Sequence, residues 1–178
     1  MNVEYVILVN PNDNPIGQME KMQAHKEAKL HRAFSVFLMN NKHQMLLQRR
    51  AIDKYHSGGL LTNACCSHQQ PNETNEVAAT RRMHHELGFS VETSTIFNFI
   101  YHAKLNNNLT EHELDHVLYG QCNYAPKVFN TNEVSEILYQ PLSFLMGDVI
   151  NNPQLYTAWF IIALPMFNAW YTKNIINR

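Results

Sequence analysis

The stretch Thr62-Asn63-Ala64-Cys65-Cys66-Ser67-His68, followed by Glu73, Arg81 and Glu86-Leu87-Gly88, determines the fold and the chemistry expected of this chain. Within it a thiol stands two residues before an imidazole, which is a reactive pairing. Residues 75–87 are predicted to form a helix, because their apolar positions recur at helical spacing and Gly88 is suited to cap the C-terminus. Residues 61–66 are expected to be a short extended segment. Residues 54–61, which contain Gly58-Gly59, are expected to be a loop.

This stretch resembles a Nudix box that has lost part of its carboxylate cluster. The residues in register with the box are Glu73, Arg81, Met83, Glu86, Gly88 and Phe89. The departures are Ser67 in place of the first Gly, Arg82 in place of the Glu after Arg, and His85 in place of the first Glu of the Glu-Glu pair. Nudix hydrolases need those carboxylates to hold divalent metals around a diphosphate. The resemblance therefore implies diphosphate binding and argues against diphosphate hydrolysis.

The composition is that of a folded protein with one domain, expected to span residues 1–178. The chain is 45% hydrophobic and 16% charged, and its formal net charge is −1. A charge near zero argues against a general nucleic-acid binder, which would carry a basic excess. The sequence has 10 histidines, more than is usual for its size, and neutral imidazole is the commonest metal ligand in proteins.

The cysteines and the apolar segments predict a cytoplasmic protein without a membrane partner. Cys65 and Cys66 are neighbours, which seldom form a disulfide, and the third cysteine is Cys122. The N-terminal residues lack the basic segment and the long apolar run of a signal peptide. Residues 158–167 are apolar, but Pro165 interrupts them and they are too few to span a bilayer.

The order of the expected elements favours an α+β fold, in which a mixed central sheet lies between helices. Strands are expected at residues 3–9, 33–39, 45–50, 97–103 and 113–122, with the first buried on both faces. Residues 33–50 and 97–122 each predict a hairpin, because asparagine-rich turns separate their apolar halves. Residues 18–29 are polar and predict a helix or a loop, and further helices are expected at residues 143–150 and 158–176.

Together with Glu111-His112-Glu113, the cysteine motif and the altered box resemble type 1 isopentenyl diphosphate isomerase, the metal-dependent family built on the Nudix fold. The resemblance runs from about Val3 to about Trp170, and the motifs are specific only in combination. It implies a Nudix-like α/β/α sandwich that interconverts isopentenyl and dimethylallyl diphosphate. The implied reaction protonates an alkene carbon, passes through a tertiary carbocation and loses a proton elsewhere.

The resemblance also implies two metal sites. The residues that match the first site are His25, His31, His68, Glu111 and Glu113. Glu111 and Glu113 alternate along a predicted strand, so both carboxylates point to the same face. Five ligands are more than a tetrahedral structural zinc site needs, which suits a higher-coordinate Mn²⁺, Zn²⁺ or Fe²⁺, and Mn²⁺ or Zn²⁺ is expected. The second site holds Mg²⁺ on the substrate diphosphate through Glu86 and the backbone carbonyl of Cys66. By itself, Glu86 would be interpreted as a solvated helix carboxylate.

Four residues match the family's catalytic positions. Cys66 and Glu113 are the implied acid–base pair, on opposite faces of the allylic unit, and Tyr101 assists Glu113. The indole of Trp159 would stabilise the carbocation through its π face. Without the family, Trp159 would be a core aromatic residue, and a buried cysteine would be inert packing, which is the interpretation preferred for Cys65.

The substrate diphosphate needs positive charge. The residues at the family's phosphate-contacting positions are Lys21, Arg50, Lys54 and Arg82, although any one of them alone would be ordinary solvated surface. Arg82 is informative, because a Nudix hydrolase has a catalytic carboxylate there.

Two alternatives remain open beside the isomerase. One is a Nudix-type diphosphate hydrolase, in which Cys66 and Trp159 would have no role. The other is a catalytically inactive diphosphate-binding module. In every case the expected partner is a small-molecule diphosphate, an isoprenoid one for the isomerase, and the chain is expected to be a monomer or a homodimer.

Overall fold

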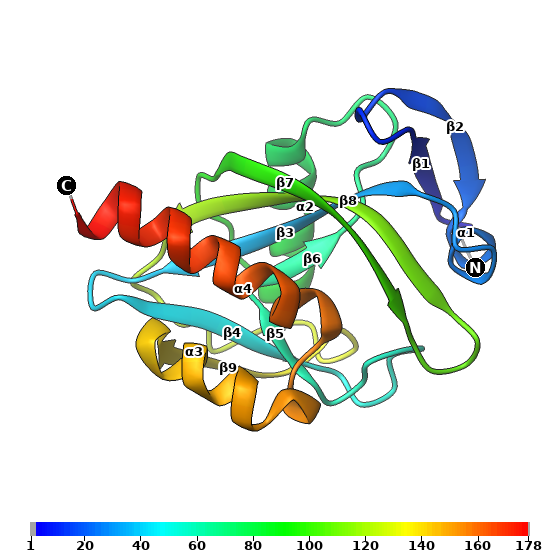
Figure 1. Ribbon diagram of the computed structural model, residues 1–178. Helices are drawn as coiled ribbons and strands as arrows, with labels where there is room; N and C mark the ends of the chain where they lie inside the picture. Colours follow the sequence, from blue (N-terminus) through cyan, green and yellow to red (C-terminus); the bar gives the residue numbers. More distant parts are fainter. Residues whose placement is uncertain (1–2, 178) are drawn as a thin grey trace.

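A mixed sheet of nine strands forms the centre of the computed structural model, which describes residues 3–177 (Figure 1). Residues 1, 2 and 178, which the single-domain prediction includes, lie outside the described residues. The strands are β1 (Tyr5–Val9), β2 (Pro15–Glu20), β3 (His31–Met39), β4 (Gln44–Arg50), β5 (Leu61–Asn63), β6 (Cys65–Ser67), β7 (Ser94–Lys104), β8 (Thr110–Gln121) and β9 (Val134–Pro141). The helices are α1 (Lys21–Lys26), α2 (Asn75–Leu87), α3 (Leu142–Asn151) and α4 (Ala158–Tyr171), with short helical turns at Pro153–Leu155 and Thr172–Ile176.

Strand β3 organises the sheet. It pairs antiparallel with β1, β4 and β6, and parallel with β8, which itself forms a long antiparallel hairpin with β7. Strand β9 pairs with the outer side of β4. One parallel pair among antiparallel ones makes the sheet mixed, so the predicted α+β fold is confirmed.

Alternation along β3 builds two separate cores. Phe37 and Met39 pack with the apolar residues of α3 and α4 on one face of the sheet. Phe34 and Val36 pack with α2 on the other face. Figure 1 shows α4 in front of the sheet and α2 behind it, which is the predicted sandwich. Because helices cover both faces, β3 is apolar almost throughout rather than alternating with polar residues.

Helix α2 has the predicted boundaries, because both ends carry caps. The Thr74 hydroxyl accepts a hydrogen bond from the backbone N–H of Val77 at 3.3 Å. At the other end Gly88 adopts φ 74°, the left-handed conformation that ends many helices, and its N–H donates to the carbonyl of His84. The caps fix the length of the helix and so the positions of Arg82 and Glu86.

The N-terminal part of the chain differs from the prediction. Residues 18–20 end strand β2, and only residues 21–26 form a helix. Strand β2 is almost wholly exposed at the sheet edge, so its sequence lacks the apolar alternation of a strand. The first strand was expected to be buried on both faces, but Val3, which precedes β1, and Tyr5, which begins it, are 61% and 53% exposed.

The remaining differences are smaller. Strand β9 lies in a segment for which the sequence predicted no element, and its burial pattern is mixed. The last predicted helix ends at Tyr171 and continues as a π-helical turn to Ile176. No helix within residues 3–177 is both long and apolar enough to cross a bilayer.

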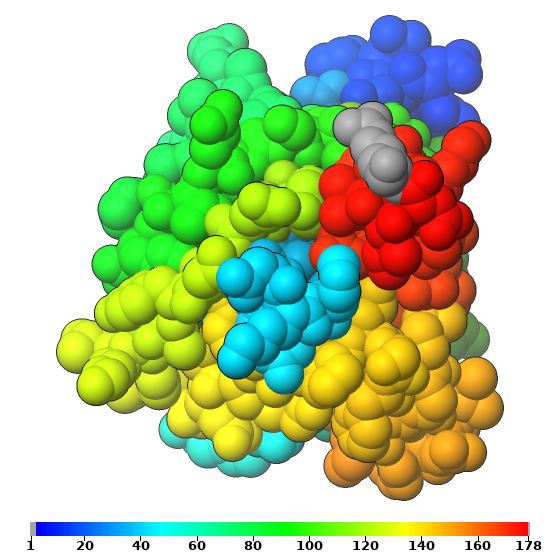
Figure 2. Space-filling view, turned by 90° about the vertical axis from the view of Figure 1, so that its left-hand side faces the viewer, coloured from blue at the N-terminus to red at the C-terminus, as the bar shows by residue number. Residues whose placement is uncertain are grey.

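The turn between β3 and β4 closes one end of the sandwich. Figure 2 shows this turn, in cyan, between the C-terminal helix and the segment after β8. The Asn41 backbone N–H donates to the side chain of Asn123 at 2.9 Å, and the His43 ring and the Tyr171 hydroxyl share a hydrogen bond of 3.0 Å. These contacts hold α4 to the sheet at this end of the sandwich.

Candidate active site

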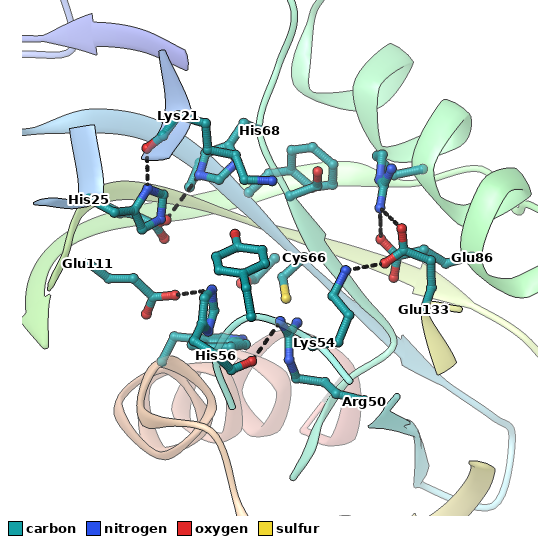
Figure 3. A pocket seen from close by; sticks show the side chains of 18 of the residues that line it. Lys21, His25, Arg50, Lys54, His56, Cys66, His68, Glu86, Glu111 and Glu133 are labelled. Atoms are coloured by element: carbon teal, nitrogen blue, oxygen red, sulfur yellow. Dashed lines mark hydrogen bonds and ion pairs between the residues drawn. The ribbon is translucent and has the colours of Figure 1, made fainter. Parts of the chain in front are cut away.

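A pocket opens at the other end of the sheet, between α1, α2, the start of α4 and the loop that joins β4 to β5 (Figure 3). Its functional groups are Lys21, His25, Arg50, Lys54, His56, Cys66, His68, Arg82, Glu86, Tyr101, Glu111, Glu113, Glu133 and Trp159. All the site residues predicted from the sequence lie here, except that His31 is fully buried in its wall. His56 and Glu133 were not predicted.

Three predicted histidines and one predicted glutamate meet on one side of the pocket. His25 comes from α1, His31 begins β3, His68 follows β6, and Glu113 stands opposite His31 in the parallel β3–β8 pairing. The imidazole centroids of His25 and His31 are 4.9 Å apart, and those of His31 and His68 are 5.1 Å apart. One ligand atom from each of the four residues lies within 4.8 Å of the others.

The orientation of these rings suits a metal ion. Nδ1 of His25 lies 2.7 Å from the carbonyl of Lys21, and Nδ1 of His31 lies 2.7 Å from the carbonyl of Lys29. Each carbonyl fixes the tautomer with the proton on Nδ1, which leaves the Nε2 lone pair free. Nε2 of His31 is buried and has no hydrogen-bond partner within the described part of the chain. Imidazole and carboxylate donors together fit a divalent transition metal, so these residues can hold one.

Glu111, the fifth predicted ligand, belongs to a second group with His25 and His56. Its Oε1 lies 3.7 Å from Nε2 of His56. His56 is 6% exposed, and burial together with the nearby Arg50 charge lowers the pKa of its ring to about 3, so the ring is neutral at pH 7. The sequence could not identify His56, because it lies in a glycine-rich loop and only the excess of histidines pointed to further ligands.

The two carboxyl groups of β8 share one phenol. The Tyr101 hydroxyl is 2.6 Å from Oε2 of Glu113 and 3.0 Å from Oε2 of Glu111. Burial and the neighbouring charge of Glu113 raise the pKa of Glu111. Burial opposes ionisation of Glu113 too, but the imidazoles of His31 and His68 outweigh it and hold the pKa of Glu113 well below its usual value. One phenol therefore contacts two carboxyl groups whose pKa values are shifted in opposite directions.

Cys66 points into the middle of the pocket, between the histidines and Glu86 (Figure 3). Alternation along β6 sends Cys65 to the other face, where it is fully buried against α2. Burial raises the pKa of the Cys66 thiol, and the charges of Glu86, Glu111 and Glu113 raise it further, against the opposing charge of Arg50. The structure thus places in the pocket the cysteine that the sequence predicted and leaves the other in the core.

Trp159 forms the wall where α4 begins. It is 3% exposed, packs in the core cluster of α4, and also lines the pocket. The Arg50 guanidinium lies 5.3 Å from its ring centroid, and the His56 ring meets it edge-on at 5.9 Å. The start of α4 is held to β5, because the backbone N–H of Thr157 donates to the Leu61 carbonyl at 3.0 Å.

Three of the four predicted phosphate-binding cations are paired with carboxylates in the free site. Lys54 lies 2.6 Å from Glu133, Arg82 lies 2.7 Å from Glu86, and Lys21 pairs with Glu4. Arg82 also lies 3.4 Å from Glu133. Burial lowers the pKa of Arg82, but the charge of Glu86 outweighs it and raises that pKa, so the guanidinium stays charged.

Glu86 is not a solvated helix carboxylate. It is 4% exposed and also accepts a hydrogen bond from the Gln48 amide at 3.0 Å. Glu133 lies just before β9, in the segment without a predicted element, and the sequence offered no signal for it. Glu86 and Glu133, with Lys54, lie on the side of the pocket opposite His25 and His68 (Figure 3), and Arg82 is paired with both carboxylates.

Comparison with known proteins agrees with this geometry. The NUDIX domain family model matches residues 29–160. An isopentenyl-diphosphate Delta-isomerase 2 from Photorhabdus laumondii is 46% identical over 88% of each chain. An isopentenyl-diphosphate Delta-isomerase from Pectobacterium atrosepticum is 43% identical, with 90% of this chain and 89% of that protein covered.

Solved structures show the same fold at low identity. A Deinococcus radiodurans protein has a TM-score of 0.67 at 21% identity and covers 84% of this chain and 90% of its own. A Nudix hydrolase from M. smegmatis has a TM-score of 0.60 at 15% identity, with 96% of both chains covered. The chain therefore belongs to the Nudix family and, within it, to the isopentenyl-diphosphate Delta-isomerases.

Proposed function

We propose that this chain converts isopentenyl diphosphate into dimethylallyl diphosphate through a tertiary carbocation, with Cys66 and Glu113 as the acid–base pair. The observation that carries the proposal is the presence of the Cys66 thiol, the Glu113 carboxylate and the Trp159 indole in one buried pocket. The names of the relatives support the substrate. A hydrolase would have no use for the thiol or the indole.

The reaction needs one proton donor and one proton acceptor. The terminal methylene of the substrate takes a proton, which leaves positive charge on the tertiary carbon, and the neighbouring methylene then loses a proton to give the internal alkene. One proton enters and one leaves, so the overall change is an isomerisation. The Cys66 thiol and the Glu113 carboxyl line the same pocket, which therefore offers one group for each step.

Tyr101 and Trp159 complete the reacting end of the pocket. The Tyr101 hydroxyl binds the Glu113 carboxyl at 2.6 Å and fixes its direction. The indole face stabilises the carbocation through its π electrons, as it does the Arg50 cation at 5.3 Å. The buried walls exclude the water that would trap the carbocation as an alcohol.

The diphosphate lies toward Lys21, Arg50, Lys54 and Arg82. Phosphate oxygens replace the carboxylates that hold Lys54 and Arg82 in the free site, and the bidentate guanidinium suits them. Mg²⁺ would be held by Glu86, once it is released from Arg82, and by the Cys66 backbone carbonyl. Both groups and the phosphate supply oxygen ligands, which Mg²⁺ prefers. When bound, Mg²⁺ neutralises charge on the diphosphate.

The histidine side of the pocket would hold Mn²⁺ or Zn²⁺ through His25, His31, His68, Glu111 and Glu113. These donors fit such an ion, as the free Nε2 atom of His31 shows. When bound, the ion places positive charge beside Glu113, which fixes that carboxyl and sets its pKa.

Proton NMR of isopentenyl diphosphate incubated with the protein and Mg²⁺ in D₂O tests the proposal. We expect dimethylallyl diphosphate to appear and deuterium to enter the allylic positions. Release of phosphate without isomerisation would instead indicate a diphosphate hydrolase. An unchanged substrate, with metal confirmed on the protein, would indicate a non-catalytic diphosphate-binding module.

A further inference from the structure

His56 is buried in the pocket although it is not part of the histidine cluster that the sequence predicted. It belongs to the loop between β4 and β5, where its carbonyl accepts a hydrogen bond from Arg50 at 3.3 Å. Its ring lies between Trp159, at 5.9 Å, and His25, at 6.2 Å. Figure 3 shows the ring directed at Glu111, whose Oε1 lies 3.7 Å from Nε2. A buried imidazole that reaches a carboxylate and another imidazole has the surroundings of a metal ligand.

The two groups of potential ligands form one centre, because they share His25. One group is His25, His31, His68 and Glu113, and the other is His25, His56 and Glu111. Nδ1 of His25 is held by the Lys21 carbonyl at 2.7 Å, so only Nε2 has a lone pair to offer. One lone pair binds one ion at a time. The two groups therefore cannot hold separate ions through His25 simultaneously.

The carboxylates also join the two groups. Tyr101 bridges Glu111 and Glu113 through their Oε2 atoms, which leaves Oε1 of Glu113 toward His31 and His68 and Oε1 of Glu111 toward His56. The two free oxygens thus face the two histidine groups from neighbouring positions on one strand. An ion between these two oxygens would be within reach of ligand atoms from both histidine groups.

We propose that His56 is a ligand of the ion held by the predicted His/Glu site, so that His25, His31, His56, His68, Glu111 and Glu113 all bind one ion. The proposal rests on the metal site of the proposed function. Four imidazoles and two carboxylates supply six donors, which suits an octahedral ion rather than a tetrahedral one. Small movements of Glu111 and His56 toward the ion bound at Nε2 of His25 complete its coordination sphere.

The surroundings of His56 supply the second hydrogen bond that a ligating imidazole needs. Its Nδ1 lies 3.2 Å from the Ser57 hydroxyl. In the proposed arrangement Nδ1–H donates to this oxygen, as Nδ1–H of His25 and His31 donates to backbone carbonyls, and Nε2 binds the ion. In the competing arrangement Ser57 donates to Nδ1, and Nε2–H donates to Glu111. His56 would then only position Glu111.

The Co²⁺-loaded protein distinguishes these arrangements by proton NMR in H₂O. Each coordinated imidazole with a protected Nδ1–H gives a hyperfine-shifted signal that disappears in D₂O. We expect His56→Gln to remove one such signal and to leave those of His25 and His31 in place. The same variant should release Co²⁺ to a competing chelator at least about tenfold more readily. The matched control is His102→Gln, which changes an exposed histidine on β7. It should keep every shifted signal and release Co²⁺ no more readily than the unmodified protein.

A second variant guards against misfolding of the first. Ser57→Ala keeps the imidazole and removes the acceptor of its Nδ1–H, so one signal should exchange with solvent faster while the others do not change. An unchanged set of signals in both variants would overturn the proposal and leave His56 as a positioning residue. Binding of two Co²⁺ ions per chain would also overturn it if His56→Gln, but not Glu86→Gln, removes the second ion.

Failure of the metal site itself has a different outcome. If the unmodified protein gives no shifted imidazole signal with Co²⁺, then the His/Glu site of the proposed function is wrong, whatever His56 does. If it gives signals that only His25→Gln and His31→Gln remove, then the site stands and the role of His56 alone is wrong.

Discussion

At the scale of single residues, the alternation of side chains along strands selects which groups face the pocket. Cys66 faces it and Cys65 does not, because successive residues of β6 point to opposite faces. The same rule places Glu111 and Glu113 together on β8, where Tyr101 reaches both. The proposed acid–base pair therefore depends on strand register, and a shift of one residue would bury the wrong groups.

Cys66→Ala should remove nearly all isomerase turnover, because no other thiol faces the pocket among the described residues. We expect a loss of at least about 10²-fold in kcat with substrate binding retained, measured by steady-state kinetics and equilibrium binding. Cys65→Ala is the control and should keep turnover, since its sulfur lies in the core behind α2. Equal loss in both variants would mean that packing, rather than proton transfer, explains the effect.

Glu113→Gln should abolish turnover as well, because an amide keeps the shape of the carboxyl but cannot accept the proton. The expected loss is about 10²- to 10⁴-fold in kcat. Glu136→Gln breaks only an exposed ion pair with Arg49 and should have nearly normal kcat. Substantial residual activity in Glu113→Gln would remove its role in proton transfer.

Trp159→Phe should keep more activity than Trp159→Ala, because a phenyl ring retains a weaker π face for the carbocation. The comparison is made on kcat, after thermal unfolding has shown that both variants are folded. If both variants lose the same activity, Trp159 acts through packing or pocket shape, which its place in the α4 core would explain.

Much of the site could be predicted from the sequence at this scale, because family motifs name residues individually. Their geometry could not. His56 and Glu133 come from loops that carry no motif, and only the tertiary fold brings them beside Glu111 and Lys54. The pairing of Lys54 and Arg82 with Glu133 also could not be predicted, because it depends on contact between segments that are distant in the sequence.

At the scale of elements, local signals determined how well each was predicted. Helix α2 has a capping threonine, helical spacing and a terminal glycine, and its predicted boundaries are confirmed. Strand β2 has none of the apolar alternation of a strand, because exposed edge positions need no apolar residues. The sequence therefore predicts elements that face a core and misses a strand that lies exposed at the sheet edge.

Gly88→Ala should destabilise the protein by at least about 1 kcal/mol, because an alanine is strained at positive φ. The added Cβ would also lie 2.9 Å from the Val128 carbonyl oxygen. Gly147→Ala is the matched control: it lies inside α3 with no atom within 4 Å of the new Cβ, and it should stabilise by about 0.5–1 kcal/mol. Urea unfolding of the two variants gives both values, and destabilisation by Gly147→Ala would contradict the reasoning.

At the scale of the whole molecule, the mixed sheet and its two helical layers agree with the fold that the hydrophobic pattern and the family resemblance predict together. That residues 1–178 form one domain stays a prediction. Pocket and core are continuous, since Trp159 belongs to both, so binding at the site should stabilise the entire fold.

Metal analysis of the purified protein should show a single tightly held transition metal ion per chain. Removing it with a chelator should lower the Tm, because an ion that binds only the folded state adds about 4 kcal/mol at a thousand times its Kd. Adding Mn²⁺ or Zn²⁺ back should restore the Tm. A metal-free protein that keeps full activity would contradict the His/Glu site.

The parallel pairing of His31 with Glu113 has a kinetic consequence. Strand β3 ends at Met39 and β8 begins at Thr110, so their contact closes a long loop of chain and is expected to form late in folding. Until then the imidazoles and carboxylates are far apart, and early folding intermediates contain no ion site. Metal should therefore slow unfolding more than it speeds folding. The metal-loaded protein is then expected to be kinetically stable, because its activation barrier to unfolding is higher.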